Sequence, residues 1–70
     1  MTVTRYEFRF AVRLSPTARA AFPELNVSRA LVDGGDSLYG PVSGLAHMRA
    51  LLDRFQTMGL TVVELRQLPD

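Results

Sequence analysis

The sequence contains no cysteine, lysine or tryptophan, and it has a single histidine, His47. The lack of cysteine excludes disulfide bonds, thiolate nucleophiles and thiolate metal sites. One imidazole cannot form a histidine cluster for a metal ion. No apolar run approaches the roughly 18 residues that a membrane-spanning helix requires, and the first residues lack the basic-then-apolar order of a signal peptide. We therefore expect a cytoplasmic protein without a metal or other cofactor.

The residues that are present are typical of one small globular domain. Of the 70 residues, 47% are hydrophobic and 21% are charged, which is enough apolar surface to offset the entropy of ordering the chain. The formal net charge of +1 implies no general attraction to nucleic acids or membranes. All eight basic residues are arginine, so a single arginine carries little functional information. We expect residues 1–70 to form one domain.

Hydrophobic periodicity predicts a strand followed by a short helix. Apolar and polar residues alternate over residues 3–14, which indicates a long, half-buried strand with Val12 on its inner side. Ser15 and Pro16 are typical of a helix start, because serine caps the first turn and proline has no N–H to leave unpaired there. The helix is expected over residues 16–22.

The middle of the chain predicts a β-hairpin. Residues 25–32 form a weaker strand pattern, and the segment Asp-Gly-Gly-Asp at 33–36 is a strong turn signal. A second strand is expected over residues 37–42. Leu38 would point into the core and Tyr39 away from it.

The last third predicts a second helix and a final strand. Ser43 is the expected cap of a helix that extends to about Met58, and Gly59 fits the left-handed residue that ends it. The apolar residues of this helix recur with helical spacing and form one buried stripe: Met48, Leu51, Leu52, Phe55 and Met58. The final strand, residues 60–68, has two possible parities; the preferred one places Val63 and Leu65 inside.

The order strand, helix, strand, strand, helix, strand predicts an α+β fold of the ferredoxin-like kind. This fold has a four-stranded antiparallel sheet of order 4-1-3-2 and both helices on one face. The first and third strands lie in the middle. The other face of the sheet is left open to water or to a partner.

Residues 38–63, LYGPVSGLAHMRALLDRFQTMGLTVV, resemble a group of small actinobacterial proteins that carry the pattern T-G-P-V-x-D-Q-A-x-L-x-G-L-L followed by L-G-L and a strand. The matching residues are Gly40, Pro41, Val42, Ala46, Leu51, Leu52, Gly59 and Leu60. Residues 5–10 are also similar to the first strand of that group. The chain departs from the pattern at Gly44, Leu45 and Arg49, where the group has polar residues. The resemblance supports the fold and implies no activity.

The polar residues that could support catalysis or metal binding have simpler explanations. His47 lies at the boundary of the apolar stripe, where a histidine is most often solvated; a catalytic or ligand role, with Ser43 in reach, is the alternative. Asp33 and Asp36 fit the chemistry of a turn, because the segment lacks the further oxygen ligands of a calcium loop. We therefore assign no catalytic, cofactor-binding or metal-binding residue.

The open face of the expected sheet is the most specific feature of the sequence. It is expected to carry four arginines, two glutamates, an aromatic residue and a valine: Arg5, Glu7, Arg9, Arg13, Tyr39, Val62, Glu64 and Arg66. Three interpretations are open. The charges form cross-strand ion pairs in water, or the face contacts another protein, or it binds single-stranded RNA. The RNA interpretation is disfavoured, because the first strand places no aromatic residue on this face for a base to stack on.

These features predict a non-enzymatic interaction or accessory module that acts by association. The expected partner is a second copy of the chain or a larger protein and not a membrane, and binding to a nucleic acid is the disfavoured alternative. A face-to-face homodimer is favoured, because a domain of this size is marginally stable alone. The alternative from another class is a ligand-binding or catalytic domain whose pocket forms between subunits.

Overall fold

The computed structural model describes residues 3–29 and 35–69. In chain order the elements are β1 (Thr4–Phe10), α1 (Pro16–Ala20), β2 (Asn26–Arg29), β3 (Asp36–Val42), α2 (Leu45–Thr57) and β4 (Val62–Gln67). The expected order of strands and helices is therefore confirmed. The predicted turn at 33–36 and the end of the strand predicted over 25–32 lie largely outside the described residues.

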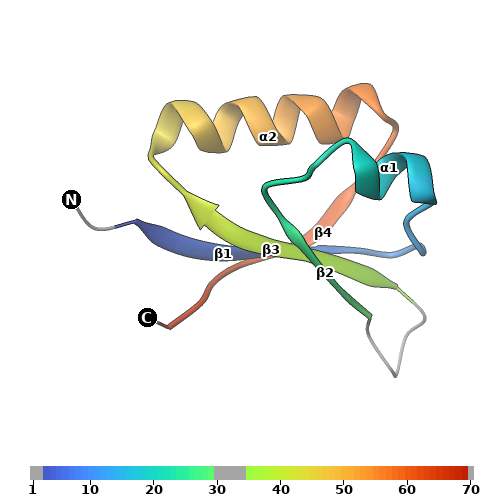
Figure 1. Ribbon diagram of the computed structural model, residues 1–70, viewed down its shortest axis with the longest axis horizontal. Coiled ribbons are helices and arrows are strands. Elements are labelled where there is room, and N and C mark those ends of the chain that lie inside the picture. Colours follow the sequence, from blue (N-terminus) through green and yellow to red (C-terminus); the bar gives the residue numbers. More distant parts are fainter. Residues whose placement is uncertain (1–2, 30–34, 70) are drawn as a thin grey trace.

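The four strands form one antiparallel sheet in the order β2-β3-β1-β4, which is the expected order written in reverse. Both helices lie on the same side of this sheet (Figure 1). The fold is α+β, with β1 and β3 in the middle and β2 and β4 at the edges. Alternation along the central strands gives the sheet one face toward the helices and one open face.

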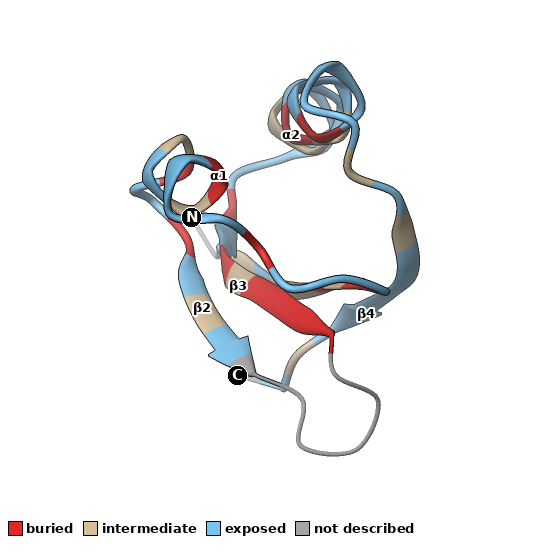
Figure 2. Ribbon diagram, turned by 90° about the vertical axis from the view of Figure 1, so that its right-hand side faces the viewer, coloured by how far each residue is buried: buried red, intermediate tan, exposed pale blue. Residues whose placement is uncertain are grey.

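The core lies between the helices and the two central strands. Phe55 of α2 is its centre, with ring centroids 5.1 Å from Phe8, 5.2 Å from Phe10 and 4.7 Å from Phe22. Leu38 of β3 is also fully buried, as expected. Figure 2 shows the burial concentrated on β3 and on the inner side of α2, whereas β4 is largely exposed.

β1 is shorter than the strand predicted over residues 3–14, and Val12 is 55% exposed rather than buried. The chain leaves the regular ladder after Phe10, because the pairing with β3 ends at Arg9 and the pairing with β4 shifts its register between Arg9 and Phe10. The backbone N–H of Asp36 donates to the carbonyl of Val12, and the Asp36 carboxylate accepts from the N–H of Leu14. Leu14 is buried in the hydrophobic core as expected, although it lies beyond the end of β1.

α1 begins as predicted and ends two residues early. The Ser15 hydroxyl accepts a hydrogen bond from the N–H of Ala18 at 3.1 Å, so the expected cap is confirmed. The N–H of Phe22 donates to the carbonyl of Arg19, only three residues back. This tightening ends the α-helical pattern before Pro23.

The C-terminus of α2 has the expected glycine. Gly59 adopts φ +75°, its N–H donates to the carbonyl of Gln56, and the N–H of Leu60 donates to the carbonyl of Phe55. These two bonds form a Schellman motif and return Leu60 to the core. Met58, by contrast, is 37% exposed, so the predicted apolar stripe is one residue too long.

The predicted parity of the last strand is wrong at its beginning. Arg9 pairs with Glu64, but the next residue of β1, Phe10, pairs with Val62, so Val63 is the extra residue of a β-bulge. The bulge places Val62 on the helix side, where it packs against the core, and leaves Val63 58% exposed. Leu65 is on the expected side, opposite Phe8, but it remains 45% exposed.

Candidate functional site

The open face of the sheet holds most of the residues that the sequence placed there. Arg5, Glu7 and Arg9 alternate with the buried residues of β1, and Tyr39 lies directly opposite Glu7 on β3. Glu64 of β4 lies opposite Arg9 on the other side. Because directly opposite residues of neighbouring strands point to the same face, these side chains share one surface.

Two of the predicted face residues lie elsewhere. Val62 is on the helix side because of the bulge that follows it. Arg13 is exposed, but it lies in the connection between β1 and α1, beyond the end of the strand. The open face therefore has neither the predicted valine nor the fourth predicted arginine.

Cross-strand ion pairs cover the β1 and β4 side of this face. Arg9 Nη1 lies 3.1 Å from Glu64 Oε1, and Arg66 Nη2 lies 2.9 Å from Glu7 Oε1. Both pairs are partly or largely exposed, and such pairs contribute about 0.2–1 kcal/mol each to stability. Their stronger effect is on the pattern of charge, because the sign alternates both along each strand and across the pair of strands.

A shallow polar hollow of about 190 Å³ lies between these charges and β2. The four charged side chains border it on one side, and Ser28 and Ser37 on the other. Ser37 is on the open side of the sheet but is still buried, because β3 lies between β2 and β1. The hollow offers hydroxyl and charged groups to water or to a polar partner.

β4 is the least covered element of the sheet. None of its six residues is buried, and both Val63 and Leu65 are exposed apolar side chains. The strand pairs with β1 on one side only, and within residues 3–29 and 35–69 no strand pairs with its other side. An edge of this kind presents backbone donors and acceptors that another strand can use.

The N-terminus of α2 differs from the prediction, because Ser43 does not cap it. The helix begins at Leu45 with Gly44 in the cap position and no side-chain cap bond. Instead, His47 Nδ1 accepts a hydrogen bond from the backbone N–H of Ser43 at 3.0 Å. His47 therefore fills a role that the sequence did not indicate, since side-chain acceptors at this position are usually Glu or Gln.

The same geometry bears on the alternative catalytic role of His47. The Ser43 hydroxyl is 3.3 Å from His47 Nδ1, within reach as expected. That nitrogen, however, already accepts the Ser43 N–H, so its lone pair is engaged by the backbone. A serine nucleophile requires this lone pair to take its proton, so the arrangement favours a structural role.

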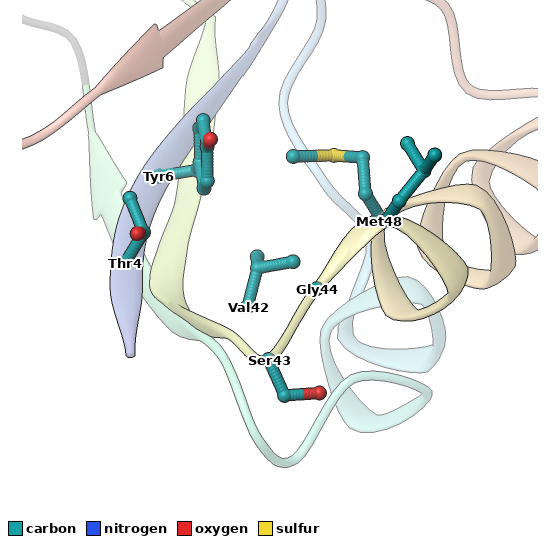
Figure 3. Close-up of a pocket in the computed structure, with 7 residues that line it drawn as sticks. Thr4, Tyr6, Val42, Ser43, Gly44 and Met48 are labelled. Carbon is teal, nitrogen blue, oxygen red and sulfur yellow. The ribbon is translucent and has the colours of Figure 1, made fainter. Parts of the chain in front are cut away.

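A cavity of about 360 Å³ opens beside the start of α2, between that helix and the first residues of β1 (Figure 3). Tyr6 and Met48 stand on opposite sides of it above Val42, and the Ser43 side chain points away from both. Its lining contains hydroxyl and apolar groups but no charged side chain: Thr4, Tyr6, Val42, Ser43, Gly44, Leu45 and Met48. The sequence did not indicate this cavity, because it depends on how far α2 stands from β1.

Metal-ligand clusters and membrane-spanning helices are both absent from the described residues. In the two described segments, no three His, Asp or Glu side chains come close enough together to hold a metal ion. Over the same residues, no helix has the length and apolar character needed to cross a bilayer.

Comparison with known proteins assigns the chain to a family. No curated protein and no solved structure matches it. A family model matches residues 5–66, which span every strand and helix described above except the first residue of β1 and the last of β4. The chain belongs to this family, which is described as a domain of unknown function, DUF8691.

Proposed function

We propose that this protein is a non-enzymatic module that acts by association, with a second copy of itself or with a larger protein. The observation that carries the proposal is the exposure of β4. Five of the six residues of this edge strand are exposed, and two of them, Val63 and Leu65, are large and apolar, so they leave apolar surface in water that a partner would bury. A small domain gains stability from such an interface.

The charge pattern of the open face supports the same proposal. Arg9 and Glu64, and likewise Glu7 and Arg66, neutralise one another within the chain. Paired charges give a surface that repels neither sign, and a partner can extend the pairing without burying an isolated charge. The predicted interaction face therefore remains part of the proposal, as the flank of the β4 edge.

A second candidate is small-ligand binding in the cavity beside α2. Its volume of about 360 Å³ lies in the range of ligand sites, and its mixed hydroxyl and apolar lining suits a neutral molecule. Leu45 at its rim is 72% exposed, so a second subunit could close it. This cavity is therefore the candidate for the predicted alternative, a ligand pocket that forms between two subunits. RNA binding has weaker support, because Tyr39 is the aromatic residue available on the described open face.

The finer features of the family and fold are also hypotheses. The strand order and the position of both helices on one face support a ferredoxin-like fold. A cytoplasmic location and kinship with the actinobacterial group that shares the Gly40-Pro41-Val42 motif remain predictions from the sequence.

Sedimentation velocity of the purified chain from low to high micromolar concentration tests the proposal. We expect a concentration-dependent shift from monomer to dimer. A monomer throughout would exclude self-association, and affinity capture from the native host, with mass spectrometry of the captured proteins, then tests for a larger partner. If the chain neither self-associates nor captures a partner, and a neutral ligand instead raises its melting temperature, the cavity is the functional site.

A further inference from the structure

The outer edge of β4 has a defined pattern of backbone groups. The N–H of Leu68 donates to the carbonyl of Arg5 at 2.8 Å, so Leu68 turns its backbone toward β1. Alternate residues of an antiparallel strand turn their backbone groups to opposite sides. Arg66, paired with Glu7, therefore faces β1, and Leu65 and Gln67 direct their N–H and C=O groups outward.

We propose that β4 pairs with β4 of a second copy, antiparallel about a two-fold axis at Leu65. This inference rests on the proposed function and names its partner and register. In this register Leu65 lies opposite the partner's Leu65, and the two residues exchange both of their outward backbone hydrogen bonds. The two sheets become one continuous sheet to which each copy contributes four strands.

Charge selects this register among the symmetric alternatives. An axis at Leu65 places Glu64 opposite the partner's Arg66, and Arg66 opposite the partner's Glu64. An axis at either neighbouring residue would place Glu64 opposite the partner's Glu64, or Arg66 opposite the partner's Arg66. Like charges directly opposite each other are destabilising, and these pairs lie at positions where side chains approach most closely.

The ion pairs already present in the chain extend this complementarity across the dimer. Arg9 pairs with Glu64 in one copy, and Arg66 pairs with Glu7 in the other. The row across the joined sheets therefore reads Arg9, Glu64, the partner's Arg66 and the partner's Glu7, with the sign of charge alternating at every step. On the other face, Leu65 covers the partner's Leu65, which removes an exposed apolar side chain from water in both copies.

The sequence after β4 also limits the length of the ladder between the two copies. Pro69 follows β4 and has no N–H to donate, so the ladder stops after Gln67. Because each copy uses the same edge, the contact is closed by the two-fold axis and does not propagate into a fibre. The expected assembly is a dimer.

Two double variants test the register while keeping the fold. Variant A carries Arg9→Glu with Glu64→Arg, and variant B carries Glu7→Arg with Arg66→Glu. Each reverses one ion pair within the chain without breaking it, and each exchanges one positive and one negative residue, so the formal net charge stays at +1. Position 64 of either variant then has the same sign of charge as position 66, so each variant repels its own copy in the proposed register.

In sedimentation velocity we expect A alone and B alone to dimerise at least about tenfold more weakly than the parent chain. An equal mixture of A and B should recover dimer, because both opposed pairs become attractive in the heterodimer. Circular dichroism and thermal melting should show that A and B fold like the parent. Leu65→Pro, which removes the outward N–H at the axis, is a second probe, and Leu65→Ala, which keeps this N–H, is its control.

The outcomes separate this inference from the proposed function. If A and B each dimerise as tightly as the parent, or if their mixture stays monomeric, the register is wrong while association stands. If the parent is monomeric at every concentration, the edge dimer is overturned together with self-association. If A or B fails to fold, Leu65→Pro decides: a dimer as tight as that of Leu65→Ala overturns the proposal.

Discussion

The carboxylate of Asp36 accepts a hydrogen bond from the backbone N–H of Leu14, with 2.7 Å between Oδ2 and N. Asp36 is buried at the start of β3, and Leu14 precedes α1 by two residues. The contact therefore anchors the connection between β1 and α1 to the sheet. It also gives a polar partner to a backbone group that the end of β1 leaves without one.

Removal of this acceptor should destabilise the fold. Asp36→Ala leaves the buried N–H of Leu14 without its partner, and we expect a loss of about 1.5–3 kcal/mol in the free energy of unfolding. Asp36→Asn keeps an oxygen acceptor and should cost less. Urea unfolding followed by circular dichroism measures both. Equal stability of the alanine variant and the parent would show that the bond contributes nothing.

Phe55 should be the most sensitive position of α2. Its ring contacts Phe8, Phe10 and Phe22, so Phe55→Ala opens a cavity at the centre of the core and should cost about 3–5 kcal/mol. Met58→Ala, on the exposed end of the same stripe, is the matched control and should cost less than about 1 kcal/mol. Chemical denaturation compares the two, and similar losses would contradict the assignment of the core.

Gly59 should resist replacement for conformational reasons alone. A Cβ at this position would have open space around it, but the φ of +75° is unfavourable for residues that carry one. Gly59→Ala is expected to cost about 1–2 kcal/mol. Gly59→Asn should cost less, since asparagine tolerates the left-handed region. Thermal melting of the three chains checks the order, and an alanine variant as stable as glycine would contradict it.

His47 should contribute more than Ser43 to the free energy of unfolding, although the sequence predicted Ser43 as the cap of α2. Ser43→Ala should change the unfolding free energy by less than about 0.5 kcal/mol, because the Ser43 hydroxyl does not cap α2. His47→Ala removes the acceptor of the Ser43 N–H and should cost about 0.5–1.5 kcal/mol. Sedimentation should show unchanged association for both. Weaker association of His47→Ala at equal stability would instead assign this residue to the interface.

The candidate site could be predicted in part, because alternation along a strand is a local property. Arg5, Glu7 and Arg9 were expected on the open face and lie there. Their partners could not be predicted from local alternation. Arg9 and Glu64 are 55 residues apart in the sequence, and their pairing depends on the register between β1 and β4. The cavity beside α2 was not predicted, because its lining comes from β1, β3 and α2, and the sequence does not show how these elements are placed relative to one another.

Local chemistry in the sequence by itself determined the order of the strands and helices, the cap at Ser15 and the left-handed end of α2 at Gly59. Each depends on a few neighbouring residues whose backbone preferences are strong. Only the tertiary structure decided the early end of β1 and the bulge at Val63. In both places a distant strand supplies the hydrogen bonds that an isolated segment lacks, and satisfying them overrides the simple alternation of apolar residues.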